Sequence, residues 1–124
     1  MDLDTDREKA LETEETQELI SSEKVDGTSV YSQNGDKLGS IHHFMVGKRD
    51  GRVRYAVLSF GGLFERDRYY PLPWRALTYN TDLDGYSVAL DKEQLKNSPS
   101  YERGNEPTYD SDYDRKVQGY YDGR

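Results

Sequence analysis

Four turn dipeptides punctuate the middle of this chain and restrict it to short segments joined by tight turns. They are Asp26-Gly27, Asn34-Gly35, Asp50-Gly51 and Asp84-Gly85. Asn-Gly and Asp-Gly supply the positive φ angles that hairpin turns need. Strand-like runs lie around these turns, at 28–32, 37–47, 53–60, 69–74, 77–80 and 86–90. Short strands at such intervals predict a mainly β (all-β) domain, either a small barrel or a sandwich.

Apolar residues are scarce and unevenly distributed, which predicts one small core flanked by two poorly folding ends. The chain has 124 residues and a formal charge of −7, and only 23 residues are Leu, Ile, Val or Phe. Residues 25–102 contain 18 of those 23, whereas residues 1–24 carry nine acids and three bases. We therefore expect an acidic, mostly disordered arm at 1–18, a domain at 19–102 and a tyrosine-rich tail at 103–124.

The alternation of apolar residues predicts where the strands are irregular. In 37–47, Leu38 and Phe44 share one parity and Ile41 has the other, so a β-bulge near His42-His43 is expected to shift the register. In 53–60, residues of both parities are apolar, which predicts a strand covered on both faces.

Proline and capping residues locate three further features. Pro71 and Pro73 share a parity, so only the opposite edge of their strand is expected to pair, with residues 70, 72 and 74 facing the core. Asp91 and Gln94 form a capping-box pattern before a short helix at 92–97. Tyr113, Val117 and Tyr121 recur every four residues, which predicts a tail helix from about residue 111. Docking over strand 53–60, a dimer contact and disorder all remain open for this helix.

The chain offers few candidates for chemistry, and we expect no catalytic residue, no cofactor and no metal. It has no Cys, and His42 and His43 should point to opposite faces of a strand, which disfavours a shared metal. The segment 80–85 resembles the start of a calcium loop, but the alternation after it favours a hairpin turn. Basic residues from Lys48 to Arg75 are interleaved with acids, so the composition disfavours nucleic-acid binding. Surface ion pairs or the chain's own acidic arm are the expected partners, and an acidic protein partner stays open.

A series of motifs in order along the chain resembles the PRC-barrel family, which is named for the cytoplasmic domain of the photosynthetic reaction-centre H subunit. The motifs are Val25-Asp26-Gly27, Lys37-Leu38-Gly39-Ser40-Ile41, the run 51–58, Phe60-Gly61-Gly62, Tyr70-Pro71-Leu72-Pro73-Trp74 and the run 95–101. The resemblance implies a six-stranded β-barrel with a short helix after the last strand and a helical tail. It also implies an adaptor or assembly surface instead of a catalyst.

A barrel of this size is filled by its own side chains, so we expect binding to use its exterior. The candidate interaction surface consists of Glu65, Arg66, Asp67, Arg68, Tyr69, Tyr113, Val117, Tyr120 and Tyr121. Structural roles are expected for Gly39, Gly61, Gly62, Pro71, Pro73 and Trp74. The main hypothesis is a non-enzymatic bacterial protein-interaction module, with an unidentified protein partner or a homodimer. The alternatives are a small-ligand or ion sensor with a cleft between barrel and tail, and an RNA- or ribosome-associated factor. No segment is apolar enough to span a membrane, so the expected location is cytoplasmic, with the periplasm left open.

Overall fold

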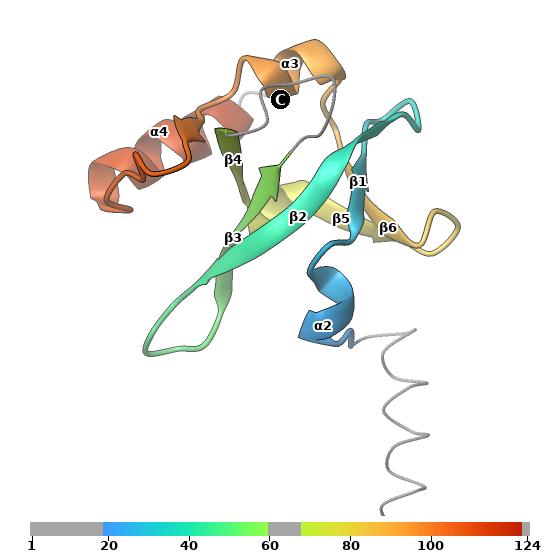
Figure 1. The fold of residues 1–124 in the computed structure, drawn as a ribbon, viewed down its shortest axis with the longest axis horizontal. Helices are drawn as coiled ribbons and strands as arrows, with labels where there is room; N and C mark the ends of the chain where they lie inside the picture. Colours follow the sequence, from blue (N-terminus) through green and yellow to red (C-terminus); the bar gives the residue numbers. More distant parts are fainter. Residues whose placement is uncertain (1–18, 60–67, 123–124) are drawn as a thin grey trace, which may run out of the picture.

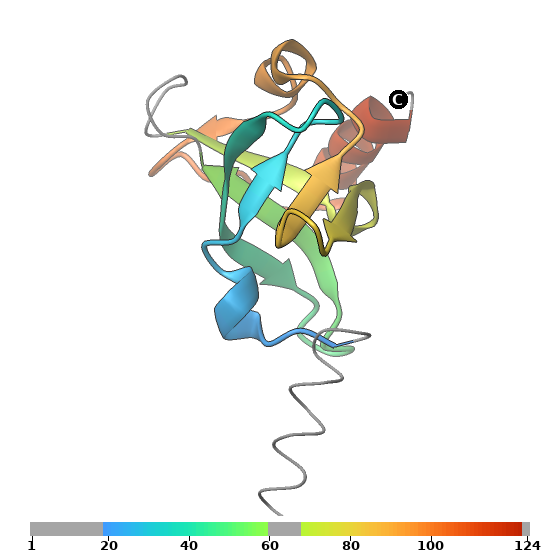
Figure 2. The same ribbon diagram turned by 90° about the vertical axis from the view of Figure 1, so that its right-hand side faces the viewer.

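A computed structural model describes residues 19–59 and 68–122 of the chain. Its elements, in chain order, are α2 (Ser22–Val25), β1 (Ser29–Tyr31), β2 (Lys37–Val46), β3 (Val53–Ser59), β4 (Arg68–Pro73), the 3-10 helix η1 (Trp74–Ala76), β5 (Leu77–Asn80), β6 (Gly85–Val88), α3 (Lys92–Lys96), β7 (Tyr101–Glu102) and α4 (Ser111–Asp122). The predicted mainly β fold is confirmed, as are the short helix after the last long strand and the tail helix. Figures 1 and 2 show the strongly curved sheet, with α4 beside β4.

The sheet has seven strands in the order β5-β6-β1-β2-β3-β4-β7, so the expected six-stranded closed barrel needs correction. Among residues 19–59 and 68–122, no pairing joins the end strands β5 and β7. Pro71 and Pro73 give part of the physical reason, since they remove donors from one edge of β4. Strand β7 pairs only with Arg68 and Tyr69, just before these prolines. Residues 70 and 72 pair with β3 and lie in the core, as predicted.

Glycine supplies the expected positive φ at three of the four turn dipeptides. Gly27, Gly35 and Gly51 have φ angles between 71° and 86°. At the fourth turn the positive φ belongs to Asp84, at 52°, and Gly85 serves a different purpose. A Cβ atom at Gly85 would lie 2.6 Å from the carbonyl oxygen of Ser29, so glycine here permits β6 to approach β1.

Bulges bend β2, and one of them is the bulge predicted near the histidines. Ile41 pairs with Leu58 and His43 with Val57, which leaves His42 as the extra residue. A second shift, not predicted, lies opposite Val30 and Tyr31, where β2 accommodates Leu38 as an extra residue. Together the two shifts explain how Leu38, Ile41 and Phe44 all contact one core despite their mixed parity.

Two clusters of buried side chains hold the fold together. The larger, which we call the inner cluster, combines mostly aliphatic residues of α2, β1, β2, β3, β4 and β6 with Leu90, Leu95 and two residues of α4. The smaller, which we call the outer cluster, consists of Val57, Tyr69 and Tyr101, with Met45, Tyr109 and Tyr113 packed against it. Strand β3 is therefore covered on both faces, as its composition predicts. None of the helices in the described ranges is long and apolar enough to cross a membrane.

Candidate interaction surface

The tail helix α4 packs on its own domain, which is the intramolecular docking that the sequence left open beside a dimer contact and disorder. Val117 and Tyr121 are buried in the inner cluster, and Tyr113 and Tyr120 pack against it. The expected position over β3 needs correction, because the packing of α4 is against β4. The outer side of β3 is covered mainly by tyrosines of β4, β7 and the segment before α4. Because α4 buries its apolar stripe here, a partner would have to displace the helix to reach that stripe.

Polar contacts fix α4 at both of its ends. Near its C-terminal end, the Tyr120 hydroxyl donates a hydrogen bond to the backbone oxygen of Gln94 on α3. Arg75 of η1 donates to Gln118 at 3.0 Å and forms an ion pair with Asp122. Near its N-terminal end, the Tyr55 hydroxyl donates to the carboxylate of Asp114. These bonds join residues 26 to 59 positions apart in the sequence, so no local pattern could have predicted them.

The outer cluster connects tyrosines from three segments. The Tyr101 and Tyr109 hydroxyls are 2.8 Å apart and share a hydrogen bond. The Tyr109 ring also makes edge contacts with Tyr55 and Tyr113, at centroid distances of 5.3 and 5.1 Å. Burial, followed by the bond to Tyr101, raises the pKa of Tyr109 strongly, and burial raises the pKa of Tyr113 to about 12. Tyr101, Tyr109 and Tyr113 therefore stay neutral at physiological pH and act as packing groups.

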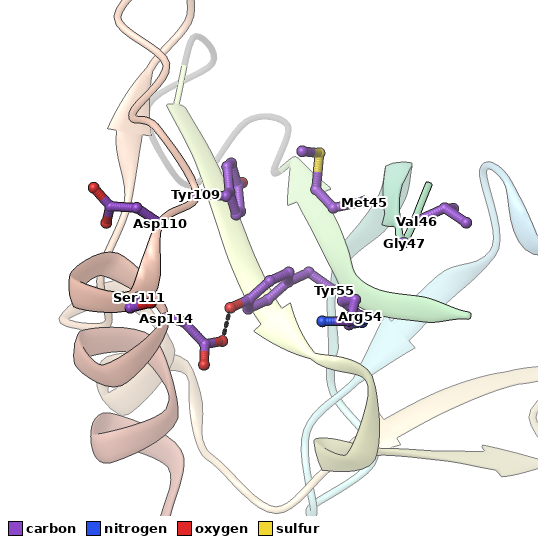
Figure 3. A pocket seen from close by; sticks show the side chains of 9 residues that line it. All are labelled: Met45, Val46, Gly47, Arg54, Tyr55, Tyr109, Asp110, Ser111 and Asp114. Atoms are coloured by element: carbon purple, nitrogen blue, oxygen red, sulfur yellow. Dashed lines mark hydrogen bonds between the residues drawn. The ribbon is translucent and has the colours of Figure 1, made fainter. Parts of the chain in front are cut away.

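An open pocket of about 340 Å³ lies between the outer cluster and the end of the β2–β3 hairpin. Figure 3 shows the residues that line it, which are Met45, Val46, Gly47, Arg54, Tyr55, Tyr109, Asp110, Ser111 and Asp114. One wall is the start of α4, where the Asp110 carboxylate accepts a hydrogen bond from the Tyr113 backbone N–H at 3.0 Å. The Tyr55–Asp114 bond crosses the pocket toward that wall. The Asp110 carboxylate caps α4 and the Asp114 carboxylate bonds to Tyr55, so both acids already have partners within the chain.

The end of the β2–β3 hairpin, which we call the hairpin surface, consists of Val46, Lys48, Arg49, Arg52 and Arg54. All five side chains are exposed, and Val46 is 52% exposed although it is apolar. Asp50 is the one acid among them, and its carboxylate accepts bonds from the Arg52 backbone N–H at 3.0 Å and from Arg54 at 2.9 Å. These bonds lower the pKa of Asp50. Residues 47–54 therefore present a net charge of +3 on a well-defined turn.

The two histidines lie differently from the prediction. Strand alternation predicts opposite faces for their side chains, and this prediction is wrong, because the bulge brings their Nδ1 atoms to 2.9 Å from each other. Both rings contact Tyr69, with centroid distances of 4.9 and 5.7 Å. The error came from applying strict strand alternation at the point where a bulge interrupts it.

The other residues of the predicted interaction surface do not lie together in the structure. Arg68 donates to Ser100 at 3.0 and 3.1 Å and lies 3.6 Å from the Glu102 carboxylate, while Tyr69 is buried. Glu65, Arg66, Asp67, Gly61 and Gly62 lie outside the described residues. The role of Glu65, Arg66 and Asp67 as partner contacts, like that of Arg68 and the tail residues, stays a prediction, and so does the structural role of the two glycines.

The predicted structural residues have clear surroundings. Trp74 begins η1 and makes edge or tilted ring contacts with Phe44 and Tyr86. Gly39 pairs with Val30 across β1 and β2, and both prolines of β4 are buried. The segment 80–85 is a hairpin turn, as predicted, because β5 and β6 pair from Leu77↔Val88 to Asn80↔Gly85.

Comparisons with known proteins match this fold. A family model described as the PRC-barrel domain matches residues 17–95. An uncharacterized protein from Deinococcus radiodurans is 30% identical over 76 residues, which cover 60% of this chain. The chain spans only 27% of the length of that relative. Strand β7, the tyrosines of the tail and α4 all lie beyond the segment that the family model matches.

Proposed function

This chain belongs to the PRC-barrel family, and from that premise we propose that it is a non-enzymatic module that binds another protein through its exterior. The inner cluster fills the space inside the curved sheet with side chains, so binding to another protein would use the exterior of the sheet. The tail helix already covers β4 and part of the inner cluster. The proposal rests on the hairpin surface, because its basic side chains are exposed and Val46 beside them is an exposed apolar residue.

An acidic segment of a partner protein fits the hairpin surface best. Arg49 and Arg52 flank a turn held by Asp50, so their backbone positions are fixed before binding. Cations on a fixed turn beside an apolar residue match a partner with carboxylates around an apolar anchor. Arginine forms paired hydrogen bonds with carboxylates, which gives such a contact geometric specificity. The pocket next to Val46 offers space for the anchor.

Charge reversal on the hairpin tests the proposal directly. The tagged full chain would capture its partner from the native host, and the purified partner would then be titrated against purified variants. We expect Arg49→Glu with Arg52→Glu to abolish this binding and to leave the melting temperature unchanged, because both side chains are exposed. The matched control is Lys92→Glu with Lys96→Glu on α3, which makes the same change in net charge at another exposed site.

Two outcomes would reject this surface. Equal binding by the hairpin and α3 variants would show that net charge, and not the hairpin, drives association. Salt-sensitive binding of RNA oligomers that is lost in the hairpin variant would favour the nucleic-acid alternative.

A further inference from the structure

The bulge in β2 creates a pair of nitrogen donors that the sequence argument had separated. His42 is the extra residue of the bulge, so its ring lies beside that of His43 instead of on the opposite face. The two Nδ1 atoms are 2.9 Å apart, and the ring planes make an angle of 84°. Tyr69 contacts both rings. Two imidazole nitrogens are thus held close together by backbone geometry before any ligand arrives.

This separation matches that of two neighbouring ligands in a metal site. Nitrogen lies about 2.0–2.1 Å from a bound divalent metal, so two nitrogens at a right angle are about 2.9 Å apart. A tetrahedral angle would require about 3.3 Å at the same bond length. Right angles between ligands are typical of tetragonal copper and nickel sites, and copper(II) binds nitrogen donors most tightly among the first-row divalent metals.

We propose that His42 and His43 form a chelating site for a divalent transition metal, with copper(II) preferred, through their two Nδ1 atoms. In the metal-free pair one Nδ1 donates its proton to the other. When the donating ring carries its proton on Nε2 instead, both Nδ1 lone pairs become available, and each ring must then turn by about 45° away from the line joining the two nitrogens to direct its lone pair to one point. The neutral pair therefore takes up the metal without net loss of a proton.

The carboxylates of Glu106 and Asp26 are close enough to His43 to act on it electrostatically, and they would attract a bound cation. In the described ranges no three His, Asp or Glu side chains converge, so water would complete the coordination.

Titration of the untagged full chain with copper(II) tests the site. We expect one copper(II) per chain, with nitrogen hyperfine structure from two imidazoles in the electron paramagnetic resonance spectrum. His42→Ala and His43→Ala should each weaken binding about 10²-fold, because each removes the intramolecular partner of a two-point contact. Nickel(II) should bind at the same place more weakly. The double variant gives the background from carboxylates and the N-terminus.

The single variants separate a chelate from two independent ligands. If each retains half of the binding at unchanged affinity, or if the spectrum reports fewer than two nitrogens, the proposal is wrong and the histidines only share a hydrogen bond. Thermal melting of each variant shows whether the fold is kept. The conservative change His42→Asn keeps a polar side chain at the bulge and should lose copper(II) to the same extent as His42→Ala.

Discussion

The two faces of β3 are covered by different kinds of side chain, which come largely from different parts of the chain. Ala56 and Leu58 face the inner cluster, which consists mostly of aliphatic residues from strands of the family-matched segment. Val57 faces the outer cluster, where Tyr101, Tyr109 and Tyr113 come from beyond residue 95. The inner face is closed by nondirectional apolar contact, whereas the outer face also depends on hydroxyl groups with specific partners. Both clusters combine residues of the family-matched segment with residues beyond it, and three of the four tyrosines of the outer cluster come from beyond it.

The largest expected effect comes from the inner cluster. Leu72→Ala removes a fully buried side chain, and we expect a loss of about 2–5 kcal/mol in the free energy of unfolding. Val57→Ala on the outer cluster deletes less apolar volume and should cost less. Urea denaturation of both variants measures the difference. A larger loss for Val57→Ala would reverse the ranking of the two clusters.

The next largest loss of stability is expected where β6 packs closely against β1. Gly85→Ala would place a Cβ atom 2.6 Å from the Ser29 carbonyl oxygen, and backbone cannot move aside as easily as a side chain. We expect a destabilisation of about 1–3 kcal/mol, which is typical of overpacking. Thermal denaturation checks it, and an unchanged melting temperature would mean that β6 separates from β1 without cost.

Two hydroxyl deletions in the outer cluster distinguish a bonded phenol from one without a partner. Tyr109→Phe removes the hydrogen bond with Tyr101 and should cost about 1 kcal/mol. The Tyr113 hydroxyl is buried without a hydrogen-bond partner among the described residues, so Tyr113→Phe should be neutral or stabilising. Urea denaturation of the two variants provides the test. Equal losses would argue that the outer cluster is held by ring contacts alone.

A gain in stability is expected from the tail helix. Gly119 lies inside α4, and a Cβ atom there would have no atom within 4 Å. Gly119→Ala should therefore stabilise the docked helix by about 0.5–1 kcal/mol, which is the difference in helix propensity. Protection of α4 amides from hydrogen exchange is the most direct measurement. No change in protection would indicate that docking, and not helix formation, limits the stability of the tail.

Alkaline pH should weaken the outer cluster while leaving neutral stability unaffected. The pKa of Tyr113 is raised to about 12, and that of Tyr109 is raised as well, so both stay protonated in the folded state above pH 10. The unfolded chain loses those protons near pH 10, so it binds fewer protons and stability falls as pH rises from about 10 toward 12. Unfolding followed at several alkaline pH values tests this, with Tyr113→Phe as the matched variant. If that variant shows the same pH dependence, other groups are responsible.

Local patterns in the sequence predicted most of the elements correctly. The capping box at Asp91 forms as expected. The Gln94 backbone N–H donates to the Asp91 carboxylate at 2.8 Å, and the Asp91 backbone N–H donates to the Gln94 side-chain oxygen at 3.0 Å. The bulge at His42 followed from the mixed parity of Ile41 and Phe44. These features depend on residues close together in the chain, so their signals are readable without the fold. The arm at 1–18 and the loop with Glu65–Asp67 lie outside the described residues, and the predictions about them stand as predictions.

The sequence by itself determined the mainly β fold, the turns, the bulge, the paired edge of β4 and the tail helix, because short-range sterics and periodicity decide each of these. Only the tertiary structure decided that the sheet stays open, that α4 packs against β4 and α3, and that His42 and His43 face each other. Those outcomes depend on contacts between residues far apart in the chain, such as Tyr55 with Asp114, or on how a bulge turns side chains in space. The spacing of residues along a sequence does not show which way a side chain points or which distant residue it contacts.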